Sequence, residues 1–211
     1  GGLTGVQARL QTPNSIVIAQ RDIDKEFKSV FIVNKKLNLT LTKELSDLKS
    51  LRNLRFTFGS ENSTSGRLMP EYFLNIAGVK TSEFKGKKPG FSGSHDATIA
   101  LVNSGAFEAG ALNKQIWEKN LKNNSKRTKN IDVFFVTPSY VDYHWLSQGD
   151  LDEKFYSGFT KKLKKAILNL NENNPNHKII LEMFNAKKFI DSDAKQYKNI
   201  EEIGRKLKKI R

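Results

Sequence analysis

The stretch F-T-F-G-S-E-N-S-T-S-G-R-L-M-P-E-Y-F-L (Phe56–Leu74) contains in order a strand, a polar loop and a helix. Its first residues extend an alternating run that predicts a strand over Leu54–Phe58. After the loop, apolar residues recur at helical spacing until Gly78, which is a typical helix terminator. A strand that leads through a polar loop into an amphipathic helix is the building unit of α/β proteins.

Three hydroxyl side chains, those of Ser63, Thr64 and Ser65, end this loop directly before the helix. Hydroxyls beside the unpaired N–H groups and the positive dipole end of a helix can surround a phosphate-like anion without Lys or Arg. Plain helix capping explains the same residues, since Ser and Thr are favoured caps. Both interpretations stay open from these residues alone. The stretch is not a P-loop, because it lacks the Gly-Lys-Ser/Thr ending.

The alternation of strands and helices continues on both sides of this unit. Short β-branched or aromatic runs predict strands over Ser15–Gln20, Ser29–Val33, Phe107–Leu112 and Asp132–Val136. Apolar residues at helical spacing predict helices over Lys43–Leu51, Ala97–Val102, Lys114–Lys122, Asp150–Asn169, Ile179–Phe184 and Ile200–Leu207, with a polar loop over Asn123–Asn130. The pattern predicts an α/β protein whose sheets are mostly parallel.

A second helix start, S-G-S-H-D (Ser92–Asp96), carries hydroxyls and the imidazole of His95. The dipole at a helix N-terminus disfavours imidazolium, so His95 is expected to be a neutral hydrogen-bond donor. A surface capping turn is the alternative. Ser94, His95 and Asp96 cannot form a catalytic triad, because they are sequence neighbours and no G-x-S-x-G elbow is present. We therefore disfavour an acyl-transfer enzyme.

A lone carboxylate, Asp142, follows the apolar strand Asp132–Val136 and lies among aromatic residues. Ligands of open α/β sheets bind beyond the carboxyl ends of strands, so this segment is a candidate cleft edge. Asp142 could accept a hydrogen bond from a protonated ligand oxygen, which an anion site of neutral donors otherwise lacks. A surface Asp in a turn is the alternative.

The composition restricts the chemistry. There are 36 Lys and Arg against 22 Asp and Glu, a net charge of +14, with no Cys and only three His. Disulfides and thiolate metal sites are excluded, and we expect no metal or cofactor. The charge favours an anionic partner, so a basic nucleic-acid-binding module is the alternative function. We expect no nucleic acid to bind, because no clustered basic patch with interleaved aromatics is visible.

Three blocks together resemble the phosphonate- and phosphite-binding components of bacterial ABC importers: Phe56–Leu74, Gly93–Asn113 and Phe134–Tyr143. Their order and spacing agree with that family over nearly the whole chain. The resemblance implies a type II periplasmic binding protein, in which two α/β lobes with mostly parallel sheets are joined by hinge strands. We expect lobe one to comprise residues 1–49 and 137–211, and lobe two residues 50–136.

The same resemblance implies a function without catalysis or cofactor. The protein would capture a tetrahedral oxyanion, such as a phosphonate or phosphite, in the cleft between the lobes and deliver it to a membrane permease. The residues that the resemblance assigns to the ligand are Ser63, Thr64, Ser65, His95, Asn113 and Asp142. We expect a periplasmic monomer, either free or tethered to the membrane, and no signal segment is visible in this chain.

The opening residues resemble a Gly-Pro-x-Ser-Tyr element inside lobe one of that family, with Gly2 in place of Pro and Gly5 in place of Tyr. We therefore expect lobe one to be incomplete at its N-terminus, and this chain by itself to bind ligand weakly or not at all. The two replacements predict a reshaped pocket. The opening Gly1–Leu10 also resembles a branch described as selenate-binding.

Overall fold

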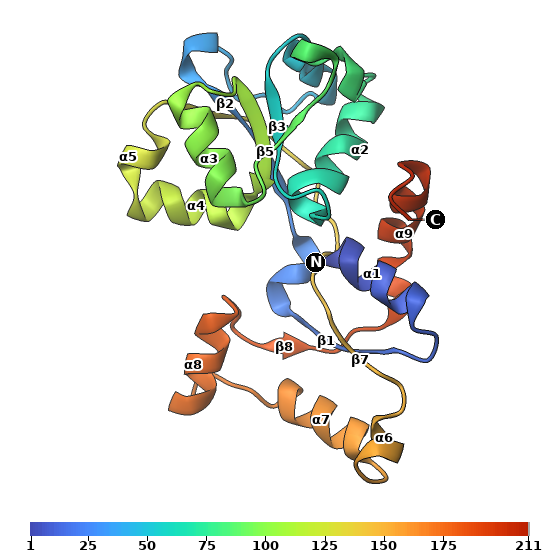
Figure 1. Cartoon of the computed structure of the whole chain (residues 1–211). Coiled ribbons are helices and arrows are strands. Elements are labelled where there is room, and N and C mark those ends of the chain that lie inside the picture. Colours follow the sequence, from blue (N-terminus) through green and yellow to red (C-terminus); the bar gives the residue numbers. More distant parts are fainter. Residues whose placement is uncertain (211) are drawn as a thin grey trace. The chain divides into compact units, whose positions relative to one another are not determined.

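The computed structural model describes residues 1–210 and divides the chain into two compact units, shown in Figure 1. Unit 1 is Gly1–Phe27 together with the chain from Ser139 onward, and unit 2 is Lys28–Pro138. The chain therefore passes between the units twice, at Phe27–Lys28 and at Pro138–Ser139. Within residues 1–210, no helix combines the length and apolar character that a membrane span requires.

The first crossing lies earlier in the chain than the sequence indicated. We expected residues 28–49 in lobe one, whereas the structure places them in unit 2. The reason is β2 (Ser29–Asn34), which pairs with β5 (Ala109–Asn113) and β6 (Ile131–Val136). An apolar strand pattern predicts that β2 is buried, but it does not identify the partner strands. The second crossing was expected between residues 136 and 137, and it lies two residues later, between Pro138 and Ser139.

Unit 2 contains one five-stranded sheet in the order β4-β3-β5-β2-β6. Figure 1 labels its strands β2, β3 and β5. Its remaining strands are β3 (Phe56–Phe58) and β4 (Gly90–Phe91). Its helices and helical turns are η2 (Lys35–Leu37), η3 (Leu45–Leu51), η4 (Thr64–Leu68), α2 (Met69–Ile76), η5 (Thr81–Glu83), η6 (Lys85–Lys87), α3 (His95–Ser104), α4 (Lys114–Asn123) and α5 (Ser125–Thr128). The short α5 lies in the segment that we expected to be a loop.

The prediction of mostly parallel sheets is wrong. β3 runs parallel to β4 and β5, but β2 is antiparallel to both of its neighbours, β5 and β6. Helical crossovers such as α2 and α3 return the chain to the same direction, which gives the parallel pairs. β2 instead enters directly from unit 1 and is inserted between β5 and β6, so it runs against them. The unit is a mixed α/β layer structure.

Both faces of β2 are buried. On one face, Val30 and Ile32 pack in a cluster with Ile99 of α3 and Trp117 of α4. On the other face, the ring of Phe31 lies among further buried aromatic rings, 6.1 Å from Phe56 and 6.0 Å from Phe135 between centroids. This double burial explains why β2 is a continuous apolar run rather than an alternating one.

Unit 1 contains a three-stranded antiparallel sheet in the order β7-β1-β8. The strands are β1 (Ile16–Arg21), β7 (Trp145–Ser147) and β8 (Phe189–Ile190). The helices and helical turns are α1 (Gly2–Gln11), η1 (Asp22–Glu26), α6 (Leu151–Lys154), α7 (Phe159–Leu168), α8 (Pro175–Met183), η7 (Ala194–Tyr197) and α9 (Lys198–Lys206). Ile18 of β1, Ile167 of α7, Leu181 of α8 and Phe189 of β8 share one apolar cluster.

The single helix expected over Asp150–Asn169 is two helices, α6 and α7. α6 ends at Lys154, and Gly158, whose φ of +84° is left-handed, is the N-cap residue of α7. The carboxylate of Asp152 accepts hydrogen bonds from the N–H groups of Gly158 at 2.8 Å and Thr160 at 2.7 Å. The apolar spacing continued across the break, so the pattern alone did not show it.

Candidate anion-binding site

Ser63 is the N-cap residue of the helical segment that follows β3, and the first turn of that segment, η4, is π-helical. Ser63 Oγ accepts a hydrogen bond from the N–H of Gly66 at 2.8 Å, and the Ser63 carbonyl accepts one from the N–H of Leu68 at 3.0 Å. The capping interpretation is therefore confirmed for Ser63. A π-helical turn is uncommon and often marks a functional site, because it alters the direction of the first N–H groups.

Thr64 and Ser65 are buried, with exposed fractions of 2% and 1%. Neighbouring strands fix this turn from two directions. Ser29 Oγ of β2 donates a hydrogen bond to the Ser65 carbonyl at 2.7 Å, and the N–H of Gly59 donates to the Gly66 carbonyl at 2.9 Å. The turn is thus held in position by the sheet of unit 2 before any ligand arrives.

His95, the first residue of α3, lies against the same turn. A methyl group at Gly66 would lie 2.9 Å from Ser63 Oγ and 3.2 Å from Cε1 of His95, so only glycine allows this close approach. The backbone N–H of Asn113 donates to His95 Nδ1 at 3.4 Å. Because Nδ1 accepts this hydrogen bond, the proton of the neutral imidazole is on Nε2.

His95 is held in its neutral form. Burial lowers the pKa of the His95 imidazole, and the nearby carboxylate of Asp96 opposes this effect only in part. A neutral ring with its proton on Nε2 is a hydrogen-bond donor without a net charge. The sequence prediction of a neutral donor at this helix start agrees with this direction.

Ser63 and His95 line one hollow of unit 2, of about 300 Å³. The residues that line it are Ser60, Ser63, Gly93, Ser94, His95, Asp96 and Ile116. Two helix N-termini, those of η4 and α3, therefore contribute to one concave surface. Among the described residues of this lining there is no Lys or Arg, so any anion here would be held by neutral donors. Ser60 and Ser94 were not among the residues expected from the sequence.

Asn113 has a structural role in this arrangement. Its Oδ1 accepts hydrogen bonds from the N–H groups of Gln115 at 2.7 Å and Ile116 at 3.3 Å, which caps α4. The side chain is 5% exposed and does not line the hollow. Its backbone N–H orients His95, so its position after β5 serves the site through the imidazole.

Asp142 belongs to unit 1 and is fully buried, so the alternative of a surface turn is wrong. Its Oδ1 accepts a hydrogen bond from the N–H of Gly2 at 2.7 Å, at the N-terminus of α1. A methyl group at Gly2 would lie 3.1 Å from the Asp142 carbonyl oxygen, which explains the small residue there. A carboxylate at this position also complements the helix dipole.

The other replacement at the start of the chain, Gly5, makes room for His144. A side chain at Gly5 would overlap the imidazole of His144. The ring of His144 lies 3.8 Å from that of Tyr197 between centroids. Burial lowers the pKa of the His144 imidazole to about 4. The local consequence of Gly5 is thus a partly buried neutral imidazole.

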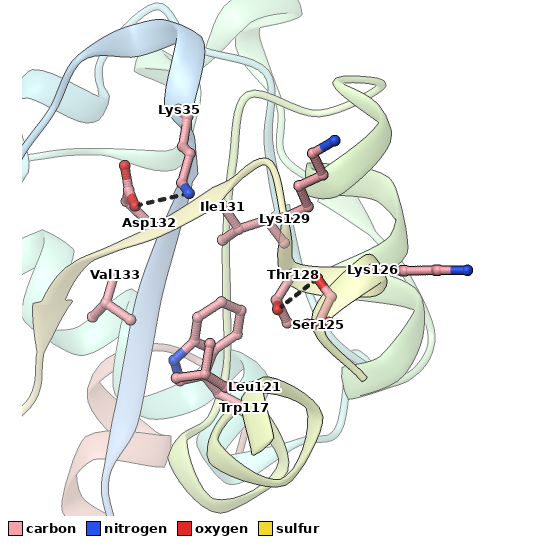
Figure 2. A pocket seen from close by; sticks show the side chains of 10 residues that line it. All are labelled: Lys35, Trp117, Leu121, Ser125, Lys126, Thr128, Lys129, Ile131, Asp132 and Val133. Atoms are coloured by element: carbon pink, nitrogen blue, oxygen red, sulfur yellow. Dashed lines mark hydrogen bonds and ion pairs between the residues drawn. The ribbon is translucent and has the colours of Figure 1, made fainter. Parts of the chain in front are cut away.

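Figure 2 shows a second hollow of unit 2, of about 580 Å³, which does not contain the predicted site residues. Trp117, Ile131 and Val133 form an apolar lining, while Lys126 extends away from it (Figure 2). Lys35 at its edge pairs with Asp132 at 3.9 Å. Over the described part of the chain, no group of three or more His, Cys, Asp or Glu is arranged to hold a metal ion.

Two α/β units, a double chain crossing and a concave surface at helix N-termini define the class of type II solute-binding proteins. Comparison with known proteins identifies the family. The chain belongs to the family described as "ABC transporter, phosphonate, periplasmic substrate-binding protein", whose model matches residues 1–197. It is therefore a periplasmic substrate-binding component of an ABC transporter and not an enzyme.

The similar proteins agree with this assignment. The chain is 74% identical over 211 residues to a protein of Prochlorococcus marinus (strain MIT 9301) named "Probable ABC transporter phosphite binding protein PhnD1", covering 100% of this chain and 71% of that protein. The solved structure of PhnD1 from that organism, in complex with methylphosphonate, superposes with a TM-score of 0.96 at 74% identity, covering 99% of this chain and 77% of the other.

A more distant structure shows the same fold. The binding-protein component of an ABC phosphonate transporter from Pseudomonas aeruginosa superposes with a TM-score of 0.76 at 20% identity, covering 96% of this chain and 65% of that one. At this identity the likeness concerns the fold alone. The type II fold of the chain is thus shared beyond its near relatives.

Proposed function

We propose that this chain captures a small tetrahedral phosphorus oxyanion, phosphite or a short alkylphosphonate, for an ABC importer. The observation that carries this proposal is the convergence of Ser63 and neutral His95, from two helix N-termini, on one hollow without Lys or Arg. The names of the 74% identical relatives, which refer to phosphite and methylphosphonate, support the choice of ligand.

Binding would replace the hydration of the anion by fixed donors. The hydroxyls of residues 63–65 and the N–H groups of Thr64 and Ser65 supply one set, and Nε2–H of His95 supplies another. The N–H of Ser63 already donates to the Ser60 carbonyl at 3.0 Å. Oriented neutral donors bind an anion by hydrogen-bond geometry rather than by net charge, so anions with different proton counts can be distinguished.

We further propose that Asp142 provides the acceptor for a protonated ligand oxygen, and that Asn113 acts through His95. A carboxylate would stabilise a singly protonated phosphite or phosphonate and repel a fully ionised anion of the same shape. The complete burial of Asp142 supports this role, since electrostatic interactions are stronger away from water.

A ligand screen tests the proposed function. The melting temperature of protein produced from its complete gene is measured with phosphite, methylphosphonate, phosphate, sulfate or selenate, because a ligand that binds the native state raises it. We expect the largest rise with phosphite or methylphosphonate. Sulfate and selenate, which carry no proton at neutral pH, should have little effect. An equal or larger rise with selenate would contradict the proposal.

We also propose that the protein acts as a periplasmic monomer that hands its ligand to a membrane permease and binds no nucleic acid. The Lys-rich surfaces are then solvated faces rather than a groove for a polyanion. Light scattering should give one chain per particle. Duplex DNA should not be retained at physiological salt, and retention with a steep salt dependence would favour the nucleic-acid alternative.

A further inference from the structure

The hollow that we assign to the anion contains an acidic residue, and this inference rests on that assignment. Asp96, the second residue of α3, lines the hollow beside Ser63 and His95. An unpaired carboxylate at this position would repel an anionic ligand. It would also favour the protonated form of the neighbouring imidazole. A site built from neutral donors therefore needs the charge of Asp96 to be balanced.

Arg127, on the short helix α5, is placed to balance it. Its guanidinium donates to Asp96 Oδ1 at 3.1 Å through one nitrogen and to the Asp96 carbonyl at 3.2 Å through the other. Asn120 of α4 completes the group, because its Nδ2 donates to the same Asp96 Oδ1 at 3.2 Å and its Oδ1 accepts from Arg127 at 3.2 Å.

This group occupies a hollow next to the candidate site. Asp96 lines both hollows, whereas Arg127 and Asn120 line only the second one, of about 250 Å³. Lys119 is the other charged residue there. Arg127 therefore reaches Asp96 from the neighbouring hollow, and the residues that line the candidate hollow include no cation.

We propose that Arg127 is a positioning residue for the anion site: it neutralises Asp96 and fixes the N-terminus of α3, so that His95 presents its donor to a phosphite or phosphonate. Asn120 supports this role by holding both partners. Arg127 lies 31 positions after Asp96 in the sequence and outside the three sequence blocks that carry the family resemblance, whereas its partner Asp96 lies within one of them.

Calorimetric titration with methylphosphonate tests the proposal. The Arg127→Gln variant should bind about three- to tenfold more weakly at low salt, because a charge several ångströms away in a largely aqueous environment contributes an effect of that order. High salt should reduce the difference. The double variant Asp96→Asn/Arg127→Gln should recover affinity to within about twofold of wild type, and Arg127→Lys should retain most of it.

The titration of His95, followed by NMR without ligand, is the second readout. Its pKa should be higher in Arg127→Gln than in wild type and should return in the double variant. The matched control is Arg52→Gln, which removes another half-exposed Arg of unit 2, paired with Glu83 at 3.1 Å and outside the hollow. This control should bind methylphosphonate as wild type does.

Two results would overturn the proposal: unchanged affinity and unchanged His95 pKa in Arg127→Gln, or a double variant that binds as weakly as the single one. The second result would show that Arg127 does not act by neutralising Asp96. A wild-type protein that binds no methylphosphonate would instead contradict the proposed function. In that case the NMR titration of His95 still decides whether Arg127 lowers the pKa of the His95 imidazole.

Discussion

His95 is the residue whose chemistry is best defined by its surroundings, because the N–H of Asn113 fixes the proton on Nε2 and burial keeps the ring neutral. We predict that His95→Phe weakens methylphosphonate binding by about 10- to 100-fold, the size of one lost hydrogen bond to a charged group. His95→Gln, which keeps an N–H donor, should lose less. Calorimetry on both variants measures this, and equal losses would show that the ring shape matters rather than the donor.

Asp142 gives a test of selectivity at the same scale. Asp142→Asn should weaken binding of singly protonated phosphite more than it weakens binding of any fully ionised anion, because the amide can donate to a bare oxygen. The N–H of Gly2 still finds an acceptor in the amide oxygen, so α1 should keep its start. Equal loss for both kinds of anion would contradict the acceptor role.

His144 predicts how the stability of the protein depends on pH. Its pKa is about 4 in the folded protein, against an ordinary value of 6.5, so the unfolded chain binds the proton more tightly. Stability from this group is complete above pH 6.5 and is lost as the pH falls from 6.5 towards 4. Urea unfolding at several pH values should show a shallower acid slope in His144→Gln. Identical slopes would argue against a neutral His144 ring in the folded protein.

At the scale of elements, the break between α6 and α7 depends on Gly158. We predict that Gly158→Ala lowers the free energy of unfolding by about 1–2 kcal/mol, since a side chain disfavours the left-handed conformation at φ +84°. Ser157→Ala, an exposed neighbour, is the control and should change little. Chemical denaturation measures both. A stability equal to wild type in Gly158→Ala would show that the two helices merge without cost.

The helices and strands also differ in how well the sequence predicted them. Strands β2, β5 and β6 were predicted because buried strands are continuous apolar runs, and α3 and α4 because their apolar faces have helical spacing. β8, of two residues, and β7, of three, are too short for a periodic signal. The direction of β2 was missed because hydrophobic pattern encodes burial and not the choice of partner.

The candidate site also contains residues that the sequence predicted and residues that it did not. Ser63 and His95 were found because each stands at a helix start, where residue type and local context carry information. The capping role of Asn113 was missed although it is local, because Oδ1 accepts from residues two and three positions later, at the start of the predicted helix Lys114–Lys122. The pairing of Arg127 with Asp96 was not found, because it depends on which helices lie side by side. Such contacts between distant residues have no signature in local spacing.

For the whole molecule, the chain is divided into two units joined by two crossings, and each unit holds its own candidate site residues. The site residues of unit 2 lie on a sheet and two helix starts that are internally hydrogen-bonded. The unit is therefore organised before ligand arrives, which lowers the entropy cost of binding.

An NMR titration of the ¹⁵N-labelled protein with methylphosphonate tests whether the turn formed by Ser63, Thr64 and Ser65 binds the anion. The amide signals of residues 63–66 and 94–96 should shift and saturate together, with the imidazole signal of His95. The signals of Trp117 and Lys129, which line the apolar hollow of Figure 2, should stay in place. Saturable shifts at that second hollow, with none at residues 63–66, would contradict the assignment.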